Sequence, residues 1–141
     1  MAASRRAWLG PNLAVGAASA ALGVVAVVVP AHLSGTVRSI GSPVFDWLFS
    51  AWHACNCLVT ITLLFGIGFA LAFRWPEQWV GAGLGAMLMF PVSAVIEMLA
   101  NANSHTLFPI EFVIYGAFTM FSLAGAGLGR WIRKRKNALA V

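Results

Sequence analysis

The segment EMLANANSHTLFPIE, from Glu97 to Glu111, divides the second half of the chain. It gathers two carboxylates, one histidine, two asparagines, a serine and a threonine between two long apolar runs. A run of about 20 apolar residues is long enough to cross a bilayer as a helix. We therefore predict that this polar segment lies at one face of a membrane, where two membrane-spanning helices meet.

Composition supports a membrane protein. The 141 residues are 60% hydrophobic and 9% charged, with a mean hydropathy of +0.85, whereas a soluble domain carries roughly 25% charged residues. We predict an all-α integral membrane protein with four transmembrane helices in an up-down bundle and one transmembrane domain over residues 1–141. The predicted helices cover about 11–30, 49–73, 78–100 and 109–131, followed by a basic cytoplasmic tail at 132–141.

Local signals refine these boundaries. Pro30 should end the first helix, and a short interfacial helix can form near 43–48. Pro91 should kink the third helix, because proline removes one backbone hydrogen bond. In the fourth helix, Gly125 and Gly129 form a GxxxG pair suited to close helix contact. A basic start before an apolar run also describes a secretory signal peptide, but the first run is long enough to span.

The aromatic residues after the first helix and the two cysteines have simple interpretations. Aromatic side chains at Phe45, Trp47, Phe49 and Trp52 fit the belt found at membrane–water interfaces. Cys55 and Cys57 point about 200° apart on a helix, and a disulfide across one residue is strained. We interpret them as small apolar helix residues in preference to a copper-binding or redox pair.

The positive charge has a one-sided distribution. Arg5 and Arg6 precede the first apolar run, and five Arg and Lys residues at 130–136 follow the last one. This is the positive-inside pattern, so we predict cytoplasmic N and C termini in a multi-pass protein of a bacterial inner membrane or a plasma membrane. The net charge of +5 then indicates contact with membrane lipids and no nucleic-acid partner.

This topology directs the polar residues to the outward face. Ionisable groups within membrane segments are costly and mark functional sites by default. Glu97 is the strongest candidate, since it lies inside an apolar helix and must be paired or hold a proton there. The predicted ligand-binding residues are Glu97, Asn101, His53, Asn56, His105 and Glu111. His53, Asn56, Cys57 and Thr60 should share one helix face, because they are spaced by three or four residues.

Each candidate also has a purely structural interpretation. Glu97 can lock two helices together, and Glu111 can stabilise the positive end of a helix that begins near Pro109. His53 can be a packing residue, His105 a loop or capping residue, and His32 an interfacial residue beside Pro30.

The sequence does not identify a cofactor. If a metal binds, His53, His105 and Glu97 are its candidate ligands, but no HxxxH, ExxH or CxxC spacing aligns two ligands on one helix. Haem would need two axial ligands at matching depth, for which His53 and His105 are the available pair.

Three functions remain in competition. The first is a protein that binds or transports a small ligand, ion or proton at the outward site, with the Gly-rich faces of the third and fourth helices building a homo-oligomer. The second is an enzyme in which Glu97, His53 and Glu111 perform acid–base catalysis on a lipid or isoprenoid. The third is an accessory subunit of a larger membrane complex. We favour binding or transport, although the apolar cytoplasmic half argues against a conduction path.

Overall fold

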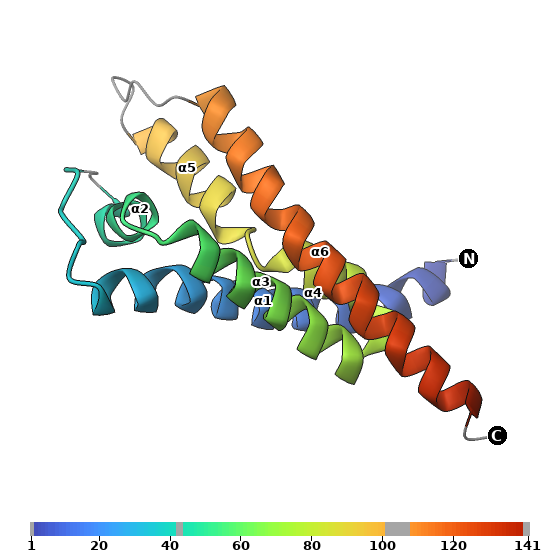
Figure 1. The fold of residues 1–141 in the computed structure, drawn as a ribbon. Helices are drawn as coiled ribbons and strands as arrows, with labels where there is room; N and C mark the ends of the chain where they lie inside the picture. Colours follow the sequence, from blue (N-terminus) through green and yellow to red (C-terminus); the bar gives the residue numbers. More distant parts are fainter. Residues whose placement is uncertain (1, 42–43, 101–107, 140–141) are drawn as a thin grey trace.

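The structure, a computed structural model, describes residues 2–41, 44–100 and 108–139. Its elements are α1 (Ala2–Leu33), α2 (Asp46–His53), α3 (Cys57–Arg74), the 3-10 helix η1 (Pro76–Gln78), α4 (Trp79–Gly85), α5 (Met89–Ala100) and α6 (Phe108–Leu139) (Figure 1). Four stretches are long and apolar enough to cross a membrane: Gly10–Leu33, Cys57–Arg74, Pro76–Ala100 and Pro109–Leu139. An all-helical chain with four potential spans is therefore confirmed for the described residues.

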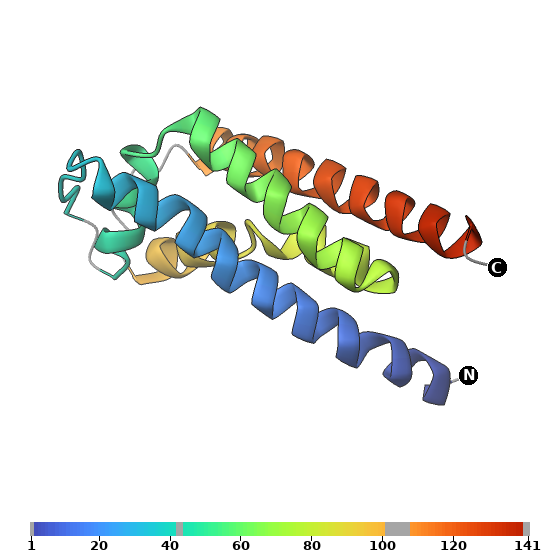
Figure 2. The same cartoon turned by 60° about the horizontal axis from the view of Figure 1, so that its bottom comes forward.

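The long helices place two different sets of residues at opposite ends of the molecule. The start of α1 and the finish of α6 lie at one end, which we call the termini end (Figures 1 and 2). Lys134 of α6 forms an ion pair of 3.1 Å with Glu77 of η1 there. At the other end, which we call the α2 end, α2 lies across the bundle beside the finish of α5. Between them, α3 packs along α6, and α4 packs against both α1 and α6.

Glycines allow the helices to touch through their backbones. A Cβ atom added at Gly125 would collide with the carbonyl oxygen of Phe65, and one at Gly129 with that of Phe69. Gly68 faces Ser122 in the same way. The predicted close contact of the GxxxG pair is thus confirmed, but it forms between α3 and α6 of one chain. Our oligomer hypothesis required this face to be free to join two copies, but it is occupied by contacts within the chain.

Gly35, and not Pro30, ends the first helix. α1 continues through Pro30 to Leu33, and Gly35 then adopts a left-handed φ of +67°. Its amide donates to the carbonyl of His32 at 3.1 Å. A left-handed glycine just beyond a helix is a common termination, because it lets the last carbonyls find donors. The prediction that the helix ends at Pro30 was wrong. Pro30 lacks one backbone N–H donor, but the turn that follows it remains helical.

The second predicted helix, 49–73, is two helices. α2 begins earlier, at Asp46, and ends at His53, and α3 begins at Cys57. Asn56 causes the second start, since its side-chain oxygen accepts from the amides of Leu58 (3.1 Å) and Val59 (3.3 Å). Asparagine is among the best N-caps for this reason. The predicted common face of His53, Asn56, Cys57 and Thr60 therefore does not exist, because no single helix carries all four residues.

The third predicted helix, 78–100, is also interrupted, as Pro91 led us to expect. The break lies at 86–88, one turn before Pro91, between α4 and α5. Pro91 has no amide to offer Met87, four residues earlier, and the carbonyl of Met87 instead accepts from the amide of Phe90 at 3.2 Å. The amide of Leu88 likewise donates to Gly85 at 2.9 Å. The span therefore stays hydrogen-bonded through the break by tighter turns.

The fourth helix is longer than we predicted. We expected it to end near Trp131 and to be followed by a basic tail, but α6 remains helical to Leu139. Arg, Lys, Ala and Leu are good helix formers, and two tail cations stack on Phe73 of α3, namely Arg133 and Lys136, both at 5.5 Å. These contacts hold the basic segment against the bundle.

Two glycines of α3 give a matched test of the backbone contacts. We expect Gly68→Ala to destabilise the fold by about 1–3 kcal/mol, because its Cβ would meet the backbone carbonyl of Ser122. Gly66→Ala adds the same group where nothing lies within 4 Å, and should be neutral or slightly stabilising because alanine favours a helix. Thermal unfolding in detergent measures both. Equal effects of the two substitutions would contradict the close α3–α6 contact.

Candidate functional site

At the α2 end, a short helix is held against the bundle by aromatic contacts. Leu48, Phe49 and Ala51 of α2 are buried in the core. The half-buried ring of Trp52 lies 5.2 Å from the ring of Phe90, 5.2 Å from that of Tyr115 and 5.0 Å from that of Phe118, measured between centroids. Aromatic pairs in these tilted and edge-on arrangements are favourable beyond their burial alone. Trp52 therefore joins α2 to both α5 and α6.

This arrangement corrects the aromatic-belt interpretation in part. Trp47 is 51% exposed, as a belt residue would be, but Phe49 is buried and Trp52 faces the core. The signal for an inward face was present in the sequence, since Phe45, Leu48, Phe49 and Trp52 follow the three-to-four spacing of an amphipathic helix.

The loop before α2 folds back onto the start of that helix. The carboxylate of Asp46 accepts from the backbone amides of Ile40 (3.0 Å) and Gly41 (2.9 Å). Gly41 adopts a φ of +77°, a conformation that L side chains disfavour. The hydroxyl of Ser50 also donates to Asp46 at 3.3 Å. These hydrogen bonds fix the position of the first turn of α2 independently of Glu97.

Glu97 connects α5 to the start of α2. It is only 5% exposed and shares the buried face of α5 with Phe90, Ser93 and Ala94. Its Oε2 atom accepts from the backbone amide of Phe45, the residue directly before α2, at 3.3 Å. Helix starts carry partial positive charge, so a carboxylate there is stabilised. Among the described residues, its Oε1 atom is buried and has no hydrogen-bond partner.

The two histidines that the structure describes bond to their own helices. The Nδ1 atom of His53 lies 2.9 Å from the carbonyl oxygen of Phe49, and that of His32 lies 3.0 Å from the carbonyl oxygen of Val28. Both residues are exposed and lie in the last turn of a helix, and each ring contacts the carbonyl oxygen four residues earlier in its own helix. His53 is about 10 Å along the axis of α2 from the end that Glu97 contacts. The structure therefore does not join Glu97 to His53.

The other predicted site residues have separate places. Asn56 caps α3. Glu111 is half-buried and lies in the first turn of α6, which is the position that its dipole interpretation requires. Asn101 and His105 lie outside the described residues, so the proposed His53–His105 haem pair has no described geometry. Within the described ranges, no three His, Cys, Asp or Glu side chains are close enough to hold a metal ion.

Of the two cysteines, only Cys57 is a helix residue as predicted. Cys55 lies half-buried in the break between α2 and α3, whereas Cys57 is exposed at the start of α3. Neither forms a disulfide. Burial, followed by the neighbouring Cys57, raises the pKa of the Cys55 thiol. Cys55 packs against the same core as α2, so its reactivity should depend on whether α2 stays in place.

Sequence reasoning missed two buried hydroxyls. In the described part of the chain, the hydroxyls of Tyr115 and Ser122 are buried and have no hydrogen-bond partner. Single Tyr and Ser residues inside apolar runs give no periodic signal, so the sequence could not show that they face inward.

Comparison of the chain with protein-family models, with curated proteins and with solved structures found no match.

Cys55 provides a test of how α2 is held. In a Cys57→Ala background, Cys55 is the single thiol of the chain. We expect Trp52→Ala to speed its reaction with a maleimide by about tenfold or more. The substitution removes three aromatic pairs at about 0.5–1.5 kcal/mol each, and about 1.4 kcal/mol corresponds to a factor of ten.

Trp47→Ala is the matched control, since it removes an exposed tryptophan from the same helix. Its labelling rate should stay close to that of the parent. If both substitutions accelerate labelling equally, Trp52 is not what anchors α2.

Proposed function

We propose that this chain is a small multi-pass membrane protein that binds a proton or a small cation at Glu97, on the outward face of the membrane. In this proposal α2 is the element that responds to binding. The supporting observation is the buried Glu97 carboxyl, with one oxygen on the amide of Phe45 and the other without a partner among the described residues.

The chemistry favours a positively charged ligand. Burying an ionised carboxylate is costly unless opposite charge or enough donors compensate it. One amide at 3.3 Å and the dipole of an eight-residue helix are modest compensation. A proton or a small cation at Oε1 would neutralise the group. Neutralisation would also remove the negative charge from the start of α2, so binding would weaken the attachment of that helix.

Charge distribution supports the outward orientation of this site. The termini end holds Arg74 and the five cations of α6, whereas the described α2 end holds Arg38 and two histidines. By the positive-inside rule, this distribution supports our proposal that the termini end faces the cytoplasm, in a bacterial inner membrane or a plasma membrane.

Packing favours binding over conduction by one chain. The contacts of Gly68, Gly125 and Gly129 bring the α3 and α6 backbones together in the half of the bundle nearer the termini. A conduction path needs polar lining through the whole bilayer, and close backbone packing leaves little room for it. Transport would therefore require a second copy or another subunit.

Acid–base catalysis has weaker support. A catalytic pair needs its two groups within reach of the same reacting atoms. The described contacts of Glu97 and His53 are each to backbone atoms at opposite ends of α2.

Infrared difference spectroscopy can test the proposal, because the chain has only four carboxyl side chains, those of Asp46, Glu77, Glu97 and Glu111. As the pH falls, the parent protein should gain a carbonyl band from a protonated, buried carboxyl. Glu97→Gln should lose this band, and Glu111→Gln should retain it. If sodium competes with the proton, the band should appear only at lower pH when sodium is present.

Labelling of the Cys55 thiol tests whether the charge of Glu97 controls the attachment of α2. Relative to Glu97→Gln at the same pH, labelling of Cys55 in the parent should be slower at high pH and approach the same rate at low pH. This follows because Gln keeps an acceptor for Phe45 but has no charge to lose. Identical spectra and identical labelling profiles for the parent and Glu97→Gln, with both proteins folded, would overturn the proposal.

A further inference from the structure

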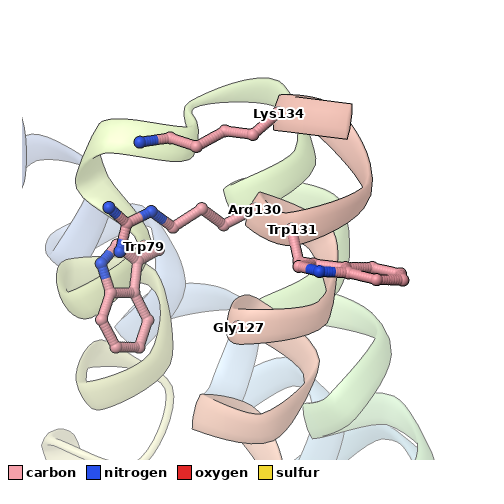
Figure 3. Close-up of a pocket in the computed structure, with 5 residues that line it drawn as sticks. All are labelled: Trp79, Gly127, Arg130, Trp131 and Lys134. Atoms are coloured by element: carbon pink, nitrogen blue, oxygen red, sulfur yellow. The ribbon is translucent and has the colours of Figure 1, made fainter. Parts of the chain in front are cut away.

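A cavity at the termini end combines two tryptophans with two cations. It has a volume of about 280 Å³ and is lined by Trp79 of α4 and by Gly127, Arg130, Trp131 and Lys134 of α6. Figure 3 shows Arg130 and Lys134 extending from α6 in the same direction, with the guanidinium of Arg130 beside the ring of Trp79. Gly127, Arg130 and Lys134 are three and four residues apart, so they share one face of α6.

Stacking holds the Arg130 side chain across the cavity. Its guanidinium carbon lies 5.3 Å from the centroid of the Trp79 ring. Arg135, on the adjacent turn, lies 4.1 Å from the centroid of the Trp131 ring. A stacked guanidinium keeps its donors in the plane of the group free for a phosphate, which it can bind through two parallel hydrogen bonds.

The helix end itself does not explain these charges. The dipole effect is confined to the last turn of a helix, and α6 ends at Leu139, nine residues after Arg130 and five after Lys134. Lys134 does have a partner, since its Nζ atom lies 3.1 Å from Glu77, but both side chains are at least half exposed. Such surface pairs contribute little, so an anion can share Lys134.

The position of the cavity fits the edge of the bilayer. It lies near the cytoplasmic limit that we propose for the spans at Pro76–Ala100 and Pro109–Leu139. Tryptophan prefers this depth because one edge of its ring is apolar and the other donates a hydrogen bond. Clusters of basic residues at the same depth attract anionic lipids.

We infer that this cavity is a binding site for an anionic glycerophospholipid. Arg130 and Lys134 bind its phosphate, and the floor at Gly127, between Trp79 and Trp131, receives the start of an acyl chain. At about 280 Å³ the cavity is below the usual size of a small-molecule pocket, which suits a ligand that is only partly enclosed. The site is separate from Glu97 and does not rest on the function proposed for it.

A second cavity at the same end shows why charge is expected to select the lipid. It has a volume of about 310 Å³ and is lined by Pro11, Ala14, Val15, Ala18, Trp75 and Gln78. None of these residues is charged. This cavity can accept an acyl chain but offers no cation among its lining residues to a phosphate.

Native mass spectrometry of the full chain in detergent tests the inference. Phosphatidylglycerol and phosphatidylcholine, with matched acyl chains, are offered at equal concentration. We expect phosphatidylglycerol to be retained preferentially, and its binding to raise the melting temperature by a few degrees. Inorganic phosphate alone should give neither effect, because it lacks the acyl chain.

Two pairs of variants distinguish lipid binding in this cavity from a general electrostatic attraction of anionic lipid to the basic helix. Arg130→Gln should weaken phosphatidylglycerol binding by about tenfold, as expected when one charge-assisted hydrogen bond is removed. Arg133→Gln removes the same charge from the same helix, but Arg133 faces Phe73 and does not line the cavity. It should leave binding nearly unchanged.

The second pair keeps every charge. Gly127→Leu fills the cavity floor, where a Cβ atom meets nothing within 4 Å, and should also weaken binding. Gly116→Leu makes the same change at another open position of α6, away from the cavity, and should not. Equal loss in Arg133→Gln, unchanged binding in Gly127→Leu, or full stabilisation by inorganic phosphate would each overturn the inference.

Discussion

Hydrocarbon offers no hydrogen-bond partner to a peptide group, and this constraint underlies most of what is unusual in the chain. At Pro91 the helix loses an amide, and the carbonyl of Met87 finds Phe90. At the start of α2, which lies outside the four potential spans, the carboxylates of Asp46 and Glu97 accept from backbone amides that precede the helix. Beyond the other end of α2, the side chain of Asn56 accepts from the first amides of α3. Tighter turns therefore supply partners inside the span, and side chains supply them at helix starts.

The same constraint divides the bundle into two halves with different chemistry. Toward the termini, helices approach through glycine until backbone meets backbone. Toward α2, helices are kept apart by large rings, and Trp52 with its three aromatic neighbours forms the junction. The long helices meet backbone to backbone, whereas the eight residues of α2 are held by side-chain contacts. Our proposal that binding at Glu97 moves α2 relies on this difference.

The spans and the glycine contact could be predicted because their signals are local. Apolar runs of about 20 residues and the Gly125–Gly129 pair act through their own positions along the chain. The break before Pro91 follows from one missing amide. Helix ends were harder, since Gly35 and Asn56 are decisive only once the backbone conformation around them is known.

The candidate site could be predicted only as a region. Glu97 was identified because a carboxylate inside an apolar run is rare, but its partner is a backbone amide 52 residues earlier in the chain. Backbone groups carry no residue-specific signal, so the sequence pointed to histidine side chains in their place. His53 proved to bond to its own helix at the far end of α2.

The length of α6 has a mechanical consequence for the whole chain. Its 32 residues measure about 48 Å, against a hydrocarbon core of about 30 Å. The part of α6 that exceeds the hydrocarbon core carries the cations. Because moving these cations into hydrocarbon is unfavourable, the charged end determines how deep the helix lies in the membrane. Any change in bilayer thickness must then be absorbed at the opposite end, where α2 and the Glu97 carboxyl lie. Thinner membranes would uncover that region and thicker ones would submerge it, which couples the burial of this carboxyl to the lipid that surrounds the protein.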